Sequence, residues 1–583
     1  MILDVSEHIA DQLIYILIDL GLFDKNVKVT HPTSLKHADY TTSIAMQLSV
    51  DAIKNNIASS SLDLAEIIKE RYLALNDEII DEINVVNPGF INFWLSKKFI
   101  STSIGLLIDN KQIDLAIKTR NREKIMIEFT DTNPFKEFHI GHLYSNIVGE
   151  SLSRLLEAQG ANVRRVIYQG DVGMHVAKAV WGFMQNLENK SGQDLVLRIA
   201  NLEEKSLHEK IKFLGDAYSY GSRAFEDDSQ AAEQIKVLNK KIYDKDIEVM
   251  PAYNVGREWS LKYFETIYAR LGTKFDNYYF ESEVGPEGSK IVKEYQLKGI
   301  FEESDGAIIF PGEKYGLHNR VFINSLGLPT YEAKELGLAP RKYKDFSYDM
   351  SVIVTGNEIN EYFRVLLKAL ELIYPDIAVK TKHISHGMVR IPEGKMSSRK
   401  GNVITGEWLL DESMHQIQDR YVKMSEDSSE KVALGAVKYS LLKFSLGSDV
   451  LFNFDESISL DGNSGPYLQY AYVRTQSILA RLEIESMDKF IFQIPESSSK
   501  DELLLLRMII QYADVINESA NMFSPHILCT YLFSLAQQFN IFYQKHKILE
   551  SDQRGFRIHL TTAVGIVLRD GLKILGIPVP EKM

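Results

Sequence analysis

Cysteine and long apolar runs are scarce in this chain of 583 residues. Its single cysteine, Cys529, excludes an intramolecular disulfide and any cysteine-rich zinc knuckle. No uninterrupted apolar run approaches the length of a membrane span, and the first residues carry acids where a signal peptide needs positive charge. We therefore expect a cytoplasmic protein that does not enter a membrane.

Positive charge is also in deficit, and the formal net charge is -13. Proteins that coat nucleic acid are usually basic overall, so that general mode of binding is disfavoured, although a local basic surface remains compatible with the sequence. The composition, 45% hydrophobic and 25% charged, is that of an ordinary globular protein. The length predicts about two to four domains.

Residues 125–168 form the stretch around which the chain is organised. An apolar β-branched run, a loop with a proline, an amphipathic helix and a second apolar run predict a strand, loop, helix and strand, which is one βαβ unit. His139 and His142 flank Gly141 where the loop becomes the helix. Residues three apart at a helix start share a face, and free backbone amides there favour phosphate. The pattern predicts a site that donates hydrogen bonds to a polyphosphate, although two solvated or capping histidines would give the same short motif.

A basic loop, residues 392–402, follows the last predicted strand. Lys395, Arg399 and Lys400 lie there between two glycines, with two hydroxyl side chains among them. Such a loop can close over a triphosphate and neutralise charge on a leaving group. A solvated basic turn is the alternative, and pairing with the histidine motif on the same sheet disfavours it.

The fold class that these patterns predict is α/β, with three domains. Residues 1–117 are expected to form an α+β module, residues 118–430 a Rossmann-type parallel-sheet domain with a helical insertion near 185–270, and residues 431–583 an all-α bundle. The remaining strands are predicted at 275–284, 306–310, 348–356 and 383–389, and the bundle helices at 431–444, 502–522, 526–547 and 556–576.

The two motifs, HIGH and KMSSR, resemble the paired signatures of class I aminoacyl-tRNA synthetases. More narrowly, the chain resembles arginyl-tRNA synthetases over nearly its whole length. The resemblance lies in the order and spacing of ADYTTSIAMQLS, PGFINFWLS, TNPFKEFHIGH, GDVGMH, FESE, PTYEAKELGLA, EGKMSSRKGN, SGPYLQYAYVR and the closing segment RIHLTTAVGIVLRDGLKILGIPVPEKM.

The resemblance implies ATP-dependent ligation of L-arginine to tRNA(Arg) through an arginyl-adenylate, with release of AMP and pyrophosphate and with ATP and Mg2+ as cofactors. Both steps are substitutions whose nucleophiles come from the substrates, so positioning and electrostatic stabilisation carry the rate. We expect no metal site built from protein ligands. The residues that the resemblance assigns to ATP are His139, Gly141, His142, Gly356, Glu358, Met388, Val389, Lys395, Ser397 and Arg399.

One position departs from the general class pattern. The second lysine of KMSKS is Ser398 here. Arginyl enzymes with this change tend to carry a lysine before HIGH, and Lys136 occupies that place. We expect Lys136 to supply the missing charge, so that the catalytic set is Lys136, His139, His142 and Lys395.

Arginine selection needs acids arranged for a planar fork of donors. The resemblance implies that Glu281 and Glu335 pair with the guanidinium, with Glu335 standing where the family usually has Asp. Tyr331 and Asp171 would line the pocket, and Asn133 would hold the amino-acid end.

The resemblance also implies that the N-terminal module contacts the tRNA elbow and that the bundle contacts the anticodon. Tyr470, Tyr472, Arg474 and Met583 are the expected anticodon neighbours, and we expect a monomer.

Other readings remain open. A cysteinyl or glutamyl synthetase is disfavoured, because one cysteine cannot build the cysteinyl family's zinc site and the spacing of the two motifs leaves no room for a large editing domain. A small-molecule nucleotidylyltransferase shares H-x-G-H but needs no RNA-sized domains. A catalytically silent tRNA-binding paralogue is disfavoured by the intact Lys136, His139, His142 and Lys395.

Overall fold

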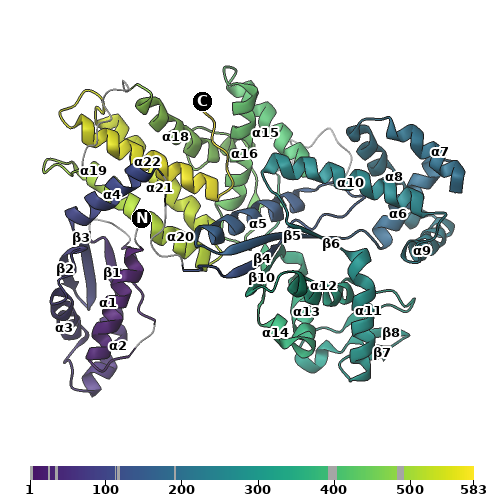
Figure 1. The fold of residues 1–583 in the computed structure, drawn as a ribbon, viewed down its shortest axis with the longest axis horizontal. Helices are drawn as coiled ribbons and strands as arrows, with labels where there is room; N and C mark the ends of the chain where they lie inside the picture. The colour runs from purple at the N-terminus through teal and green to yellow at the C-terminus, as the bar shows by residue number, and fades with distance from the viewer. Residues whose placement is uncertain are drawn as a thin grey trace.

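The computed structural model describes residues 4–23, 26–32, 37–111, 113, 119–188, 192–391, 404–481 and 492–583. Figure 1 shows an N-terminal module at the lower left, a bundle of helices above it, a central sheet, and a helical insertion at the right. No stretch of helix in these ranges has both the length and the apolar character that a bilayer crossing needs.

The N-terminal module is an antiparallel sheet covered by helices. Its elements are α1 (Val5–Asp19), β1 (Tyr40–Thr42), α2 (Ile44–Lys54), α3 (Ser61–Leu73), β2 (Ile80–Val86), β3 (Phe90–Leu95) and α4 (Lys97–Asn110), with strand order β1-β3-β2. Ile9, Leu13 and Ile16 are buried along α1, as their helical spacing predicts. The alternating residues after Pro88 form β3.

The central sheet has five parallel strands in the order β11-β10-β4-β5-β6. They are β4 (Lys124–Glu128), β5 (Asn162–Gln169), β6 (Asn277–Phe280), β10 (Met350–Gly356) and β11 (Thr381–His386). Side chains alternate between two faces, so Ile125 and Ile127 pack with α5 (Ile140–Ala158), whereas Met126 packs in a separate core with α12 (Tyr331–Asp345). This is the Rossmann-type sheet predicted from the βαβ pattern.

Helices carry the chain from β5 to β6, from β6 to β10 and from β10 to β11. The first group is α6 (Met174–Asn186), α7 (Gly192–Glu203), α8 (Leu207–Asp227), α9 (Ser229–Tyr243) and α10 (Met250–Leu271), and it begins before the region near 185–270 where the sequence predicts a helical insertion. Between β6 and β10 lie α11 (Glu281–Leu297), then a small sheet of β7 (Glu302–Ser304), β8 (Ala307–Phe310) and β9 (Arg320–Ile323), then α12. Between β10 and β11 lie α13 (Asn360–Ile373) and α14 (Pro375–Ala378).

Two predicted strands are too long. The strand predicted at 275–284 ends at Phe280, because Glu281 and Glu283 lie in the first turn of α11, where acids favour a helix start. The strand predicted at 383–389 ends at His386, and the chain then forms β12 (Val389–Arg390), which pairs with β13 (Val450–Leu451) outside the main sheet.

The C-terminal region is helical, as predicted. It comprises α15 (Gly406–Arg420), α16 (Glu426–Leu442), α17 (Phe454–Ser457), α18 (Gly465–Leu479), α19 (Lys500–Ile510), α20 (Tyr512–Asn521), α21 (Pro525–Lys545) and α22 (Arg554–Ile574). The helix predicted at 502–522 is two helices that meet at Gln511. That residue keeps φ -64° and ψ -12°, so the apolar periodicity does not reveal the break.

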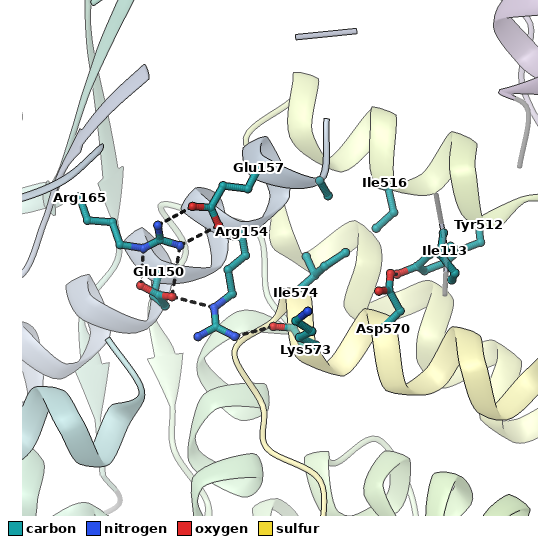
Figure 2. Close-up of a pocket in the computed structure, with 11 residues that line it drawn as sticks. Ile113, Glu150, Arg154, Glu157, Arg165, Tyr512, Ile516, Asp570, Lys573 and Ile574 are labelled. Atoms are coloured by element: carbon teal, nitrogen blue, oxygen red, sulfur yellow. Dashed lines mark hydrogen bonds and ion pairs between the residues drawn. The ribbon is translucent and has the colours of Figure 1, made fainter. Parts of the chain in front are cut away.

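The far end of α5 joins the sheet to the bundle. Arg154 donates to the Lys573 carbonyl at 2.8 Å and to the Gly272 carbonyl at 3.1 Å, at the C-terminal ends of α22 and α10. The buried Lys438 donates to the Leu271 and Gly576 carbonyls, both at 2.6 Å. A cavity of about 570 Å³ lies beside this joint, and Figure 2 shows the charged residues of α5 and β5 on one wall and α20 and α22 on the other. One rigid helix thus reaches from the histidine motif to the bundle.

Candidate active site

The two histidines of the first motif form the start of α5. His139 is the N-cap, and its Nδ1 accepts the His142 backbone N–H at 3.3 Å, while His142 Nδ1 accepts the His139 backbone N–H at 3.3 Å. The imidazole rings stack with centroids 3.5 Å apart. A side chain at Gly141 would come within 3.0 Å of the His139 ring, so glycine leaves room for this stack.

Both imidazoles are held in the neutral state. Burial, with Lys136 adding to it, lowers the pKa of His139 to about 4, and burial with His139 and Lys136 lowers the pKa of His142 well below its usual value. Because each Nδ1 accepts a backbone N–H, the proton of each ring is on Nε2. The pair therefore presents two neutral N–H donors, which suits phosphate oxygens.

Lys136 brings the positive charge next to these donors. Burial, followed by the neighbouring Lys178, lowers the pKa of Lys136, whereas Glu281 acts in the opposite direction. The ammonium also lies 5.9 Å from the ring centre of Tyr218 on α8. Lys136 thus lies between the histidine motif and the acids of the next pocket.

The second motif lies outside the described residues, including Lys395, Ser397, Ser398 and Arg399. The chain that follows it, however, pairs directly with the first motif. Ile140 N–H donates to the Ile404 carbonyl at 3.0 Å, and Gly406 N–H donates to the Phe138 carbonyl at 2.7 Å. The chain that leads into it, Val389–Arg390, pairs with β13.

The end of β10 lies close to the same histidines. A side chain at Gly356 would collide with the Glu358 carboxylate, at 2.1 Å, and this carboxylate raises the pKa of His139 against the larger effect of burial. Met388 is half exposed, but its backbone N–H donates to Asp449 at 2.9 Å and its carbonyl accepts Val450 N–H at 2.8 Å. Its neighbour Val389 lies in β12.

A pocket of acids adjoins Lys136. A side chain at Gly170 would meet Asn133 Oδ1 at 2.3 Å and Glu281 Oε1 at 3.3 Å, so these two residues converge on one glycine after β5. The other oxygen of Glu281 accepts the Lys334 ammonium at 2.5 Å, and both side chains are buried. Burial raises the pKa of Glu281, and Lys334 only partly offsets it. Tyr331, 55% exposed, lies at the rim with Lys334 5.1 Å from its ring centre.

Glu335 belongs to a second set of carboxyl groups, with Glu128 and Asp131. Burial, then Glu128, raises the pKa of Glu335 well above its usual value, and the same two causes raise the pKa of Asp131. Lys342 pairs with Glu128 at 2.7 Å, with side chains 3% and 1% exposed. Three carboxyl groups therefore share one ammonium, and the crowding of the acids favours the neutral form of Glu335 and Asp131 until a second cation arrives.

Sequence reasoning missed Glu128 and Lys342. The available signal was an acid at the end of an otherwise apolar strand, which marks the carboxyl end of a parallel strand, where α/β sheets bind ligands.

Asp171 is bonded by the protein's own groups. Its Oδ2 accepts Arg257 Nε at 2.9 Å, the Ser282 hydroxyl at 2.7 Å and the Tyr253 hydroxyl at 3.2 Å. Its Oδ1 accepts the Ser282 backbone N–H at 2.9 Å. The carboxylate therefore ties α10 to the first turn of α11, directly beside Glu281.

Three of the expected anticodon neighbours lie on α18. The Arg474 guanidinium lies over the rings of Tyr470 and Tyr543, at 4.7 and 4.9 Å, and donates to Asn540 at 2.5 Å. Tyr472 packs partly against the bundle core. Met583 lies elsewhere, against a small cluster formed by α15 and α16. In the described part of the chain, no group of three or more His, Cys, Asp or Glu side chains is arranged to hold a metal ion.

Comparison with known proteins identifies the family. A family model described as "tRNA synthetases class I (R), catalytic domain" matches residues 104–454, the arginyl tRNA synthetase N-terminal domain matches residues 4–95, and the DALR anticodon binding domain matches residues 468–583. The chain belongs to the arginyl-tRNA synthetase family. Charging of tRNA(Arg) with arginine is the function of this class I synthetase family.

Individual relatives of this synthetase family are similar along the whole chain. The arginine–tRNA ligase of Borreliella afzelii is 29% identical over 100% of both chains, and that of Parabacteroides distasonis is 29% identical over 88% of this chain and 89% of its own. Among solved structures, arginyl-tRNA synthetase from Plasmodium falciparum superposes with a TM-score of 0.81 at 21% identity, covering 100% of both chains. The enzyme from Thermus thermophilus gives 0.76 at 21% identity over 99% and 100%. These structures share the fold of the present chain.

Proposed function

We propose that this arginyl-tRNA synthetase activates L-arginine with ATP where the start of α5 meets the end of β10 and the first turns of α11 and α12. The assignment depends on one arrangement of charged and hydrogen-bonding groups. Lys136 is close enough to lower the pKa of both His139 and His142, which present neutral N–H donors, and close enough for the Glu281 carboxylate to act on it. A phosphate site and a cation pocket thus adjoin at a single lysine.

The proposed ATP site uses the start of α5 and the ends of two strands. His139 and His142 donate from Nε2 to phosphate oxygens, and Gly141 leaves the helix start open. Gly356 and Glu358 hold the ribose, while Met388 and Val389 frame adenine. The resemblance implies that they do so through the backbone, but the Met388 N–H and carbonyl already bond to Asp449 and Val450, so we propose that the half-exposed Met388 side chain meets adenine instead. Lys395, Ser397 and Arg399 complete the phosphate contacts.

The first step is attack of an arginine carboxylate oxygen on the α-phosphorus, with pyrophosphate leaving. Negative charge shifts onto the leaving group, so Lys136 and Lys395 stabilise the transition state more than bound ATP. In the second step a tRNA ribose hydroxyl attacks the arginyl carbonyl, and AMP leaves.

Mg2+ would be held through phosphate oxygens of ATP, as Mg2+ commonly is, and would offset their charge. The residues fit this use, because the phosphate side of the site offers N–H donors and a lysine rather than a cage of carboxylates.

The proposed arginine pocket begins at Asn133, which holds the amino-acid end, and runs to Glu281 and Glu335 at the guanidinium end. Tyr331 closes the rim. Asp171 holds α10 and α11 in place beside the pocket and does not contact arginine, because its oxygens already accept hydrogen bonds from Arg257 and Ser282. We also include Glu128, since it acts directly on Glu335 and pairs with the buried Lys342.

The flanking regions are proposed to hold tRNA(Arg), with boundaries near 117 and 430. The N-terminal module contacts the elbow, and Tyr470, Tyr472, Arg474 and Met583 lie near the anticodon. The stack of Arg474 on two tyrosines supports this, since exposed aromatic and guanidinium planes bind bases. We further propose a cytoplasmic monomer.

Pyrophosphate exchange with each amino acid, with and without tRNA, tests the proposal. Exchange with arginine alone supports it, exchange with another amino acid reassigns the pocket, and no exchange under any condition supports a silent tRNA-binding paralogue. Lys240→Ala, on the exposed face of α9, is a matched control for Lys136→Ala.

A further inference from the structure

Tyr168 is a buried phenol at the ligand-binding end of the sheet, and neither the activity nor the resemblance assigns it a role. It is the penultimate residue of β5 and packs in the core shared with α12, on the same face as Met126 and Val166. The side chain is 8% exposed, and its hydroxyl has no hydrogen-bond partner among the described residues. Buried hydroxyls are normally bonded, so an unbonded one at this edge points to a ligand.

Carboxyl groups surround this hydroxyl. Besides burial, the groups that raise the pKa of Tyr168 are Glu281 at the start of α11, Glu335 on α12, Tyr362 on α13 and Glu128 at the end of β4. The backbone of Tyr168 is also fixed, because its N–H donates to Asp131 Oδ1 at 3.1 Å. The phenol is therefore held on a fixed strand, in the core that β5 shares with α11, α12 and α13, and near the acids of the arginine pocket.

Two of these acids already have lysine partners. Lys334 takes one oxygen of Glu281, and Lys342 takes one oxygen of Glu128. A guanidinium carries only donors, whereas a phenol can accept one N–H and donate its own hydrogen to a carboxylate. A phenol oxygen placed near the acids can therefore accept a guanidinium N–H that the carboxylates do not reach. The phenol O–H can at the same time donate to one of the carboxylates.

We propose that the Tyr168 hydroxyl is a specificity-determining contact for the guanidinium group of arginine, set between Glu281 and Glu335. This rests on the proposed function. A lysine substrate presents one compact ammonium, which cannot span two carboxylates and the phenol as a planar fork does.

Tyr168→Phe tests the contact. We expect the KM for arginine in pyrophosphate exchange to rise about tenfold, since one buried hydrogen-bond partner is lost. The kcat and the KM for ATP should stay unchanged, and the preference for arginine over lysine, as the ratio of kcat/KM values, should fall about tenfold. Tyr72→Phe is the control, because it removes the hydroxyl of another buried tyrosine, one that lies in the N-terminal module and donates to Asp77 at 2.9 Å.

An unchanged KM for arginine in Tyr168→Phe overturns the inference while leaving the proposed function intact. So does an equal rise in Tyr72→Phe, or a fall in kcat with no change in KM, because these describe general packing damage. Thermal melting checks that the variant folds. Should it unfold, Tyr168→Met, which fills the space with a flexible apolar chain, is put through the same measurements. Wild-type protein that exchanges with no amino acid instead refutes the proposed function itself.

Discussion

Replacing Asp171 by Asn distinguishes a residue that positions the arginine pocket from one that binds arginine. The wild-type carboxylate is fully buried and accepts four hydrogen bonds, from Arg257, Tyr253 and both the hydroxyl and the backbone N–H of Ser282. The hydroxyls can rotate, but the Arg257 N–H and the Ser282 N–H are fixed donors on opposite oxygens. An amide has one accepting oxygen, so one fixed donor must face the amide NH2.

The cost follows from that mismatch. Losing a charge-assisted bond to Arg257, or leaving the Ser282 N–H unpaired, costs about 2–4 kcal/mol in the free energy of unfolding. For a domain of this size we expect the melting temperature to fall by about 4–8 °C. The KM for arginine should rise only about threefold, because Glu281 loses its anchored neighbour and keeps its own charge.

Differential scanning calorimetry and pyrophosphate exchange on the same preparation give both quantities. Asp345→Asn is the control, since that carboxylate accepts Tyr279 and Arg341 nearer the surface and should shift melting by under about 2 °C. An unchanged melting temperature with a hundredfold rise in KM would refute the reasoning and place Asp171 on the substrate.

Three further results are expected. Lys136→Ala should slow adenylation about a hundredfold by single-turnover kinetics with little change in ATP affinity, and equal losses in both would contradict its transition-state role. Burial and Glu128 raise the pKa of Glu335, and a bound guanidinium favours the ionised form of this acid. Affinity should therefore increase as pH rises through that raised pKa, and calorimetry in buffers of different ionisation enthalpy should detect proton release; buffer-independent heats would exclude it. Arg474→Ala should raise the KM for tRNA about tenfold at constant KM for arginine, and unchanged tRNA kinetics would remove the stack from the RNA interface.

Local chemistry made the first motif predictable. His139 and His142 are three residues apart at a helix start, and that spacing alone brings each ring to the other's backbone N–H. The same holds for β4, α5 and β5, whose periodicity is that of their elements. The boundary at Glu281 was wrong, because an alternating pattern continues past the strand while the acids of the next turn begin a helix.

The arginine pocket depended on contacts that no local pattern carries. Glu128 and Lys342 are 214 residues apart, and Asp171 and Arg257 are 86 apart. A carboxylate in a sequence is most often exposed, so nothing marked these acids as buried and paired.

The order of strands, helices and motifs was determined by the sequence itself, because helical and strand periodicity and turn residues act over a few neighbouring positions. Only the tertiary structure decided which charges meet. Glu128, Glu281 and Glu335 come together near the carboxyl ends of the parallel strands. Lys334 pairs with Glu281, Lys342 pairs with Glu128, and the Tyr168 hydroxyl near them has no partner among the described residues. An ion pair in a low-dielectric interior depends on distances between elements far apart in the chain, and packing alone sets those distances.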